Sequence, residues 1–238
     1  MCEPMNLNRL PWDSDFWGIN FYNLVESTGL CHDDVDKPYL IQSKVEKSNT
    51  HKRQCLEKNG YQCVEQKITL VQQVEKKFTK RVDIRPIKLD EIQPLQDEIG
   101  SLFIENSRYR MLDLQRVKDF YYYWLANSCS GSQDTYIDGY FIENQLTGFV
   151  SYRVKNNVLI IGLFGVLSPF QGKGIAKLLL EHVNYIAQQL QLESISVSTQ
   201  ASNKNALKAY IKQGFKISLE EFWYYKMDLS RGEKHDFI

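Results

Sequence analysis

Apolar and polar residues follow a regular order along most of this chain, and that order predicts a succession of strands and helices. In the first part, we expect strands at 21–25, 40–45 and 67–71 and a short helix from Asp33 to Pro38. A further helix is expected from Asn49 to Asn59, because asparagine is a favourable N-cap and Gly60 stands where the helix should end. These elements indicate a small α/β unit in the first 80 residues.

The second part of the chain continues with longer elements. We expect strands at 82–86, 140–143, 148–152, 158–167, 194–198 and 222–227, and helices at 90–106, 114–126, 175–189 and 203–213. Residues 144–147 separate two of these strands with a hairpin turn pattern. The apolar run Val158–Leu167 has ten residues, too few for a membrane span of about 18, and fits a buried strand. The order of elements predicts the α/β class, in the α+β form in which helices pack on a mixed sheet.

Two segments of the chain, 154 residues apart, resemble each other. Ser48–Tyr61 and Ser202–Phe215 share a serine, an asparagine, a lysine and a glycine at four of fourteen positions. Each is expected to contain a helix with a strand before and after it. Because asparagine caps and glycine stops recur in unrelated helices, convergence explains the similarity as well as duplication does. If duplication is the cause, residues 1–80 are a degenerate copy, and residues 81–238 form the domain that carries the chemistry.

Composition and charge exclude several classes of function. The chain has 29 Lys and Arg against 29 Asp and Glu residues, so it lacks the overall basic charge of a nucleic-acid-binding protein. The first residues show no apolar stretch of a secretory signal, and no segment predicts a membrane span. The five cysteines are odd in number and lack CxxC spacing. We therefore expect no disulfide framework, no metal site and a cytoplasmic location.

A glycine-rich loop between a strand and a helix is the most informative segment of the sequence. The strand 158–167 ends before Pro169, and a helix opens out of the tetrapeptide 171–174, Gln-Gly-Lys-Gly. The first amides of a helix have no partners within it and lie at the positive end of its dipole. Glycines let a ligand approach these amides closely, so the loop predicts a cradle for a pyrophosphate. The loop matches neither the Walker sequence nor the dinucleotide-binding GxGxxG pattern.

The loop follows the pattern Gln/Arg-x-x-Gly-x-Gly/Ala through Gln171, Gly174 and Ala176, and it resembles the acetyl-CoA-binding motif of the GCN5-related N-acetyltransferase (GNAT) superfamily. The elements that follow, an amphipathic helix, a strand and a helix containing Tyr210, are typical of that family too. The resemblance implies the GNAT acyltransferase fold with a smaller N-terminal α/β half-domain, and acetyl-CoA as cosubstrate without a metal. It also implies cofactor contacts from a strand end, the loop and a later helix start, at Leu163, Phe164, Gly165, Val166, Gln171, Gly172, Lys173, Gly174, Ile175, Ala176 and Asn203.

A closer resemblance, to one subgroup of this family, extends over residues 10–228. It is carried by Leu10–Gly18, Asn106–Arg110, the aromatic residues Phe120, Tyr121 and Trp124, and the segment from Ser198 to Tyr210. The subgroup acetylates the amine of a nucleotide-linked amino sugar, a dTDP-4-amino-4,6-dideoxyhexose, for surface polysaccharides. The resemblance thus implies a small nucleotide-sugar partner, and it leaves the oligomeric state open, a homodimer included. Alternatives are a GNAT enzyme for a protein N-terminus or another small amine, and a non-catalytic acyl-CoA-binding module.

Five side chains are candidates for chemistry, and each has an ordinary structural explanation beside the functional one. Tyr210 is the expected acid that protonates the leaving thiolate, but tyrosines are also common in cores. Asn203 is explained equally well as a helix cap. Glu65 matches a glutamate of the subgroup and is the candidate base, or it is an exposed strand glutamate. Arg108 and Arg110 suit a diphosphate through bidentate hydrogen bonds, or are two solvated loop arginines.

Overall fold

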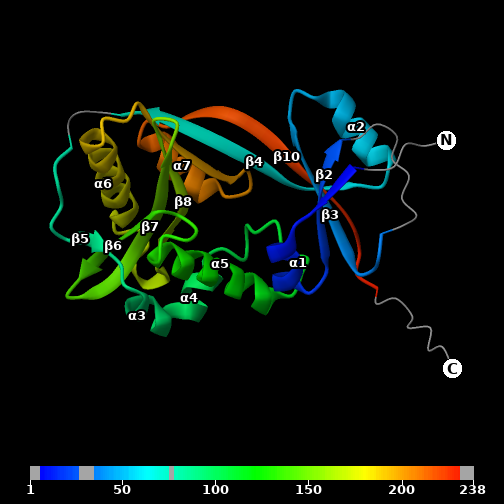
Figure 1. Ribbon diagram of the computed structural model, residues 1–238. Coiled ribbons are helices and arrows are strands. Elements are labelled where there is room, and N and C mark those ends of the chain that lie inside the picture. The colour runs from blue at the N-terminus through cyan, green and yellow to red at the C-terminus, as the bar shows by residue number, and fades with distance from the viewer. Residues whose placement is uncertain (1–5, 27–34, 75–77, 231–238) are drawn as a thin grey trace. The chain divides into compact units, whose positions relative to one another are not determined.

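The structure is a computed structural model of the 238-residue chain, and it describes residues 6–26, 35–74 and 78–230 (Figure 1). The chain divides into two units, one containing Met1–Lys67 and Glu220–Ile238 and the other containing Ile68–Leu219. Both divisions fall within long strands, β4 (Gln62–Gln73) and β10 (Lys216–Asp228), so each of these strands contributes residues to both units. The expected domains, residues 1–80 and 81–238, stay a proposal.

The first unit contains strands in the order β1–β2–β3–β10–β4. Its other elements are β1 (Asn6–Arg9), α1 (Pro11–Trp17), β2 (Asn20–Glu26), β3 (Tyr39–Glu46) and α2 (Thr50–Lys58). β2 and β3 run parallel, whereas β10 is antiparallel to β3. Leu56 of α2 is fully buried and packs with Ile41 and Val45 of β3 and with Tyr224 of β10. This cluster is the core of the first unit.

The second unit contains strands in the order β4–β9–β8–β7–β6–β5. Its other strands are β5 (Ile84–Pro86), β6 (Tyr136–Ile142), β7 (Gln145–Lys155), β8 (Val158–Val166) and β9 (Ser194–Gln200). Its helices are α3 (Leu89–Ile92), α4 (Gln96–Ser101), α5 (Leu114–Cys129), α6 (Ile175–Gln189) and α7 (Lys204–Lys212). Neighbouring strands are antiparallel from β5 to β8, whereas β8 and β9 are parallel. The unit is therefore a mixed sheet with helices.

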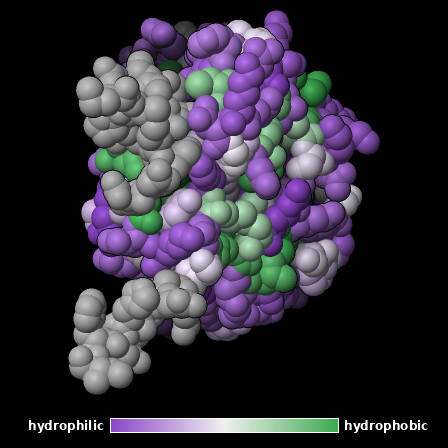
Figure 2. Space-filling view, turned by 90° about the vertical axis from the view of Figure 1, so that its right-hand side faces the viewer, coloured by the Kyte–Doolittle hydropathy of each residue, from purple (hydrophilic) through white to green (hydrophobic). Residues whose placement is uncertain are grey.

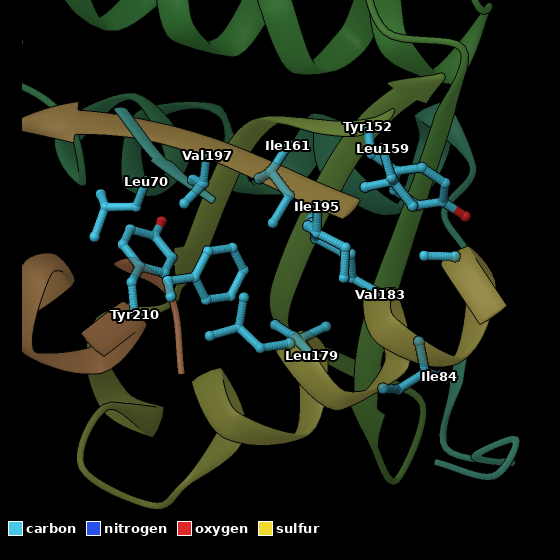
Figure 3. Packing of buried hydrophobic residues seen from close by; sticks show 14 of the residues in the cluster. Leu70, Ile84, Tyr152, Leu159, Ile161, Leu179, Val183, Ile195, Val197 and Tyr210 are labelled. Atoms are coloured by element: carbon cyan, nitrogen blue, oxygen red, sulfur yellow. The ribbon is translucent and has the colours of Figure 1, made fainter. Parts of the chain in front are cut away.

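The core of the second unit lies between α6 and the sheet. Leu179 and Val183 stand four residues apart on α6, on its apolar face, and both are fully buried. They pack with Val150 of β7, Leu159 of β8 and Ile195 of β9 (Figure 3). Burying one such side chain contributes roughly 1.5–3 kcal/mol to stability. This packing fixes α6, and with it the loop that precedes α6, against the middle of the sheet.

The opposite face of the same sheet is covered by α5. Phe149 of β7 contacts Phe103, whose ring stacks on Tyr121 of α5 with centroids 4.7 Å apart. Because neighbouring residues of a strand point to opposite faces, Val150 packs on the α6 side and Phe149 on the α5 side. The central strands of the second unit thus carry a helix on each face.

Most of the predicted elements are confirmed, and the differences have local causes. The helix expected at 90–106 is wrong as a single helix: α3, a 3₁₀ turn that contains Pro94 and α4 replace it, since proline lacks an N–H donor. The hairpin turn consists of Glu143 and Asn144, both with positive φ, rather than of residues 144–147. The short helix expected from Asp33 begins outside the described residues. β1 and α1 have no predicted counterpart, because four and seven residues are too short to show a period.

Free thiols and polar surface characterise the described part of the chain. Cys55, Cys63 and Cys129 are free, whereas Cys2 and Cys31 lie outside the described residues. No helix in the described ranges is long and apolar enough to cross a membrane. Within those ranges, no group of three His, Cys, Asp or Glu side chains is arranged to hold a metal ion.

One face of the molecule is mainly hydrophilic, with hydrophobic residues gathered in limited areas (Figure 2).

The two similar segments of the sequence have the same local structure. Asn49 and Asn203 each cap a helix through their side-chain oxygen, which accepts from the backbone N–H three residues later. Gly60 and Gly214 follow the helices with φ of 80° and 91°. The aromatic residue after each glycine is buried, and its N–H donates to the carbonyl five residues earlier. β3–α2–β4 and β9–α7–β10 therefore repeat one set of backbone bonds.

Replacing the cap of α2 should measurably destabilise the protein. Asn49→Ala should lower the free energy of unfolding by about 1 kcal/mol, because the N–H of Lys52 loses its acceptor. Asn49→Asp is the control, since aspartate keeps a capping oxygen and should match the wild type within about 0.5 kcal/mol. Urea denaturation measures both values. Equal stability of Asn49→Ala and wild type would mean that this cap contributes nothing.

Candidate active site

β8 and β9 are paired over only part of their length. Their parallel pairing ends where Ile161 lies opposite Val197. β8 continues to Val166 and β9 to Gln200, but these ends are not paired with each other in the described structure. β8 meanwhile stays paired with β7 up to its last residue. One edge of β8 is therefore open just before the glycine-rich loop begins.

A β-bulge in β8 stands at the point where the two strands part. Gly162 and Leu163 together lie opposite Ser151 of β7. The N–H of Leu163 donates to the Ser151 hydroxyl at 2.8 Å rather than to a backbone carbonyl. A bulge of this kind bends a strand and increases its local twist. This accounts for the departure of β8 from β9 beyond Ile161.

The backbone at the open edge of β8 offers hydrogen bonds to a ligand. The N–H groups of Leu163 and Leu167 both donate to groups of β7. Successive N–H groups of a strand point to opposite edges, so Gly165 also faces β7, whereas Phe164 and Val166 face the edge that β9 has left. An extended ligand chain can pair with such an edge like an added strand. Of the expected strand contacts, Phe164 and Val166 are thus the accessible donors.

The glycine-rich loop connects the end of β8 with the start of α6. Gly172 and Gly174 have φ of 76° and 82°, and Gly174 is the N-cap residue of α6. A Cβ atom added at either glycine would meet no protein atom within 4 Å, so the space beside them is open. The described residues give no acceptor to the amides of residues 172–176. Amides at the positive end of a 15-residue helix suit an anion, as the sequence predicts.

Side chains of the loop divide between the protein and the solvent. Gln171 donates to the carbonyl of Val166 at 3.0 Å and so braces the loop against β8. Lys173 is exposed, with its ammonium 5.2 Å from the centroid of the Phe170 ring. Ile175 is buried in the core, so its backbone amide is the group it can offer to a ligand. Ala176, which follows, is half-buried.

Tyr210 lies on α7, next to the end of β8. The centroid of its ring is 5.9 Å from that of Phe164 and 5.7 Å from that of Phe215. The side chain is 4% exposed, and its hydroxyl points toward Leu70 (Figure 3). Burial raises the pKa of the phenol above its ordinary value near 10, so the hydroxyl is protonated at neutral pH. The ring of Tyr210 thus lies beside Phe164, near the unpaired end of β8.

The turn before α7 connects two of the candidate regions. Asn203 caps α7 with its side-chain oxygen, as the structural explanation predicts, and this leaves its side-chain NH₂ for a ligand. Ser202 donates to the side-chain oxygen of Asn106 at 3.0 Å. Asn106 belongs to the segment that carries Arg108 and Arg110. This hydrogen bond therefore attaches the arginine segment to the start of the helix of Tyr210.

Arg108 and Arg110 have different surroundings. The Arg108 guanidinium lies over the Tyr109 ring, 4.4 Å from its centroid, and donates to the Tyr109 hydroxyl. Tyr109 is buried, and its N–H donates to the Ser107 hydroxyl. Arg110 is exposed, and its side chain forms no hydrogen bond or ion pair with any described residue. Arg110 is thus the arginine whose side chain is available to an anionic ligand.

Glu65 and Ser151 lie on different strands, β4 and β7. Glu65 lies on β4 within the first unit and is half-buried, whereas Tyr210 and the loop belong to the second unit. Its role as a base stays a prediction. Ser151 of the bulge is not among the predicted site residues. In the sequence it is one of three buried hydroxyl residues of β7, with Thr147 and Tyr152, so no local signal distinguishes it.

The matched family agrees with this geometry. Residues 101–215 match the model of the acetyltransferase (GNAT) family. That range contains the parted strands, the glycine-rich loop, α6 and Tyr210. The chain contains a GNAT acetyltransferase domain. The protein is accordingly an N-acetyltransferase, as the loop motif predicts.

Relatives of known sequence or structure extend the comparison beyond this range. The chain is similar to dTDP-fucosamine acetyltransferase from Escherichia coli O6:H1, with 24% identity over 229 residues, 93% of this chain and 98% of that protein. A GCN5-related N-acetyltransferase from Sphaerobacter thermophilus has a TM-score of 0.57 at 18% identity, over 80% of this chain and 60% of that one. A functionally unknown conserved protein from Staphylococcus epidermidis has a TM-score of 0.54 at 14% identity, and the match covers 96% of this chain and 93% of that one. The likeness to the Sphaerobacter acetyltransferase, together with the family match, confirms the expected GNAT fold.

Filling the glycine cradle should weaken the binding of coenzyme A. Gly174→Asn should lower affinity about tenfold or more, because asparagine tolerates positive φ but its side chain occupies the space beside the helix amides. The control is Gly131→Asn, at a glycine with φ of 73° in the turn after α5, which should bind as the wild type does. Calorimetric titration with coenzyme A compares the variants. Unchanged affinity in Gly174→Asn would contradict the cradle.

Proposed function

We propose that this N-acetyltransferase transfers an acetyl group from acetyl-CoA to the amine of a nucleotide-linked amino sugar, a dTDP-4-amino-4,6-dideoxyhexose, for surface polysaccharide synthesis. The observation that carries the proposal is the match to dTDP-fucosamine acetyltransferase, which covers 98% of that protein. A match limited to residues 101–215 would support acetyl transfer alone. The longer match includes the residues before and after this range, where an acceptor would be selected.

Acetyl-CoA fits the groups that the second unit leaves unbonded. The amides of Gly172 to Ala176 suit its pyrophosphate, and exposed Lys173 adds a positive charge there. The open edge of β8, through Phe164 and Val166, suits the amide groups of its pantetheine arm. When bound, acetyl-CoA supplies an activated acetyl group. The free cysteines of the described chain fit a reducing cytoplasm, where we place the reaction.

The residues of this chain have three tasks in the reaction. As the amine nitrogen bonds to the thioester carbon and the carbon–sulfur bond breaks, an N–H of the open β8 edge polarises the carbonyl oxygen. Tyr210 donates its proton to the departing sulfur, and burial keeps that proton in place until then. The proton that the amine loses passes to Glu65 or through water to solvent. Holding the two reactants in this order supplies several kcal/mol of the rate enhancement.

The acceptor's diphosphate is proposed to bind at the arginine segment. Arg110 has an exposed and unbonded guanidinium, and the segment is attached to the turn before α7 through Asn106 and Ser202. A guanidinium can bind a diphosphate through two parallel hydrogen bonds. Arg108, which Tyr109 holds in place, adds a second positive charge. A chain without net charge needs such local cations to attract an anionic substrate.

We further propose that residues 1–80 are a degenerate copy of part of residues 81–238 and contribute to acceptor recognition. The repeated caps and glycine stops of β3–α2–β4 and β9–α7–β10 support a common origin. The first copy has Leu56 where the second has Tyr210, and it has no glycine-rich loop before a helix. Acetyl-CoA chemistry is therefore assigned to the second copy.

A substrate panel tests the proposed function directly. The protein is incubated with acetyl-CoA and, in turn, a dTDP-linked 4-amino-4,6-dideoxyhexose, the free amino sugar, a polyamine and a peptide with a free N-terminus. Release of thiol measures turnover. The dTDP-linked sugar should give the highest kcat/KM. A higher value for the peptide or the polyamine would contradict the proposed acceptor while keeping the N-acetyltransferase activity.

Removing the hydroxyl of Tyr210 should slow turnover. Tyr210→Phe should bind acetyl-CoA normally but lower kcat by roughly 100- to 10,000-fold, the usual contribution of a general acid. Because burial raises the pKa of this phenol, the wild-type rate should not fall on the alkaline side before the ordinary pKa near 10. The control Tyr61→Phe removes an equally buried hydroxyl from the first unit and should keep its kcat. A kcat for Tyr210→Phe close to wild type would mean that Tyr210 only packs.

Removing Arg110 should impair recognition of the nucleotide part of the acceptor. Arg110→Ala should raise KM for the dTDP-linked sugar roughly 10- to 100-fold, the size expected for hydrogen bonds to a charged group. Arg108→Ala should act in the same direction. Arg85→Ala is the control, because Arg85 is paired with Glu91 and its loss changes net charge equally. Steady-state kinetics on the dTDP-linked and the free sugar decide the matter. An equal loss on both sugars would rule out a diphosphate contact.

A further inference from the structure

A buried carboxylate lies directly beside the β-bulge of β8. Asp134, which precedes β6, has no solvent exposure. Its Oδ2 accepts from the Ser151 hydroxyl at 2.6 Å and from the Trp124 indole at 3.1 Å, and its Oδ1 accepts from the Arg153 guanidinium at 2.6 Å. A buried carboxylate is costly unless it is paired and hydrogen-bonded, and this one is both. Three side chains, those of Ser151, Trp124 and Arg153, thus hydrogen-bond to this one buried carboxyl group.

Gly162 gives this carboxylate its place against the strand. A Cβ atom at this position would lie 1.8 Å from Oδ2 of Asp134, so any other residue would displace the carboxylate. Gly162 does not have a positive φ, and close approach is therefore the reason for glycine here. The carboxylate packs on the first residue of the bulge itself.

Two consecutive hydrogen bonds connect the carboxylate to the backbone of β8. The Ser151 hydroxyl donates to Asp134 and accepts from the N–H of Leu163. In a bulge, two residues share one partner on the neighbouring strand, so the second N–H needs another acceptor. Because the Ser151 hydroxyl donates its hydrogen bond to Asp134, a lone pair of its oxygen is free to accept from the N–H of Leu163. We call the pair Asp134–Ser151 the bulge anchor.

The bulge determines which backbone groups reach the open edge. One residue more or less in a strand reverses the direction of every following N–H group. With the bulge in place, Phe164 and Val166 point to the open edge. Without the extra residue, their N–H groups would turn toward β7, and Gly165 would face the open edge instead.

We propose that Asp134 and Ser151 are positioning residues of the acetyl-transfer site. They hold the bulge in one register, and so keep the N–H groups of Phe164 and Val166 directed at the pantetheine arm and thioester of acetyl-CoA. The inference rests on the proposed function in one respect: it takes the open edge of β8 as the edge that binds acetyl-CoA.

The test compares two buried serines of the same cluster. Ser151→Ala removes the anchor, whereas Ser128→Ala removes a hydroxyl that donates to the carbonyl of Trp124 at 2.9 Å and accepts from the backbone N–H of Asp134 at 3.4 Å. Ser128 contacts the backbone of Asp134 and not its carboxylate or β8, so its loss leaves the link from the carboxylate through Ser151 to Leu163 in place and should affect mainly stability. The ligands are acetyl-CoA and 3′-phospho-ADP, which has the pyrophosphate but lacks the pantetheine arm. Calorimetry gives the dissociation constants of wild type and both variants for each ligand.

Ser151→Ala should separate the two ligands. Its affinity for 3′-phospho-ADP should equal that of wild type, and its affinity for acetyl-CoA should fall about tenfold, the size expected for one lost hydrogen bond. The infrared carbonyl stretch of thioester-labelled acetyl-CoA, which binding should lower in wild type, should return toward the value of the free molecule. Ser128→Ala should resemble wild type in all three measurements.

Two further measurements keep the test decisive if Ser151→Ala folds poorly. Ser151→Cys keeps a weak acceptor of similar size and should fall between wild type and alanine. Amide exchange of Leu163 reports the anchor without any ligand, and the N–H should be protected in wild type and Ser128→Ala but exchange faster in the Ser151 variants.

Several outcomes would overturn the proposal. They are unchanged acetyl-CoA affinity and carbonyl stretch in both Ser151 variants, equal weakening of both ligands, or the same changes in Ser128→Ala. A wild-type protein that binds neither ligand would refute the proposed function, and the positioning role with it. If wild type binds both ligands and the Ser151 variants bind acetyl-CoA as wild type does, with the same carbonyl stretch, the positioning role alone is refuted.

Discussion

β8 has hydrogen-bonding neighbours on both edges up to Ile161 and on one edge beyond it. An unpaired strand edge leaves backbone groups without partners, which is unfavourable unless water or a ligand completes them. The other features of the second unit are arranged around this edge. The loop 171–174 begins where the edge ends, α6 directs its first amides to the same region, and Tyr210 contacts the side chain of Phe164. The chemistry assigned to the protein depends on that one strand being left unpaired.

Local signals in the sequence were sufficient for the parts of the site that depend on one segment. The glycine-rich loop, the start of α6 and the cap Asn203 each follow from a few neighbouring residues, and the structure has them where the sequence predicts. The break at Pro94 also had a local signal, but the apolar spacing on both sides of it gave the stronger indication of one helix. In that case the missing N–H donor of proline outweighs the periodicity.

Features that depend on pairing between distant segments could not be predicted in this way. The bulge at Gly162 exists only in relation to Ser151 of the neighbouring strand, and no pattern within β8 reveals it. The buried state of Asp134 likewise follows from three partners on α5 and β7. Arg108 and Arg110 are indistinguishable in the sequence, and only the position of the Tyr109 ring separates the engaged arginine from the exposed one. Tertiary contacts decide each of these cases.

The composition of the first unit from both ends of the chain has a consequence for biosynthesis. β3 pairs with β10, so that Tyr39 lies opposite Asp228, and these partners are synthesised 189 residues apart. A nascent chain therefore carries β2 and β3 with one edge unsatisfied while the whole GNAT domain is being made. Such late, long-range pairing slows folding and exposes a strand edge to other chains. Most of the second unit is synthesised before β10, and β10 then supplies the missing neighbour of β3.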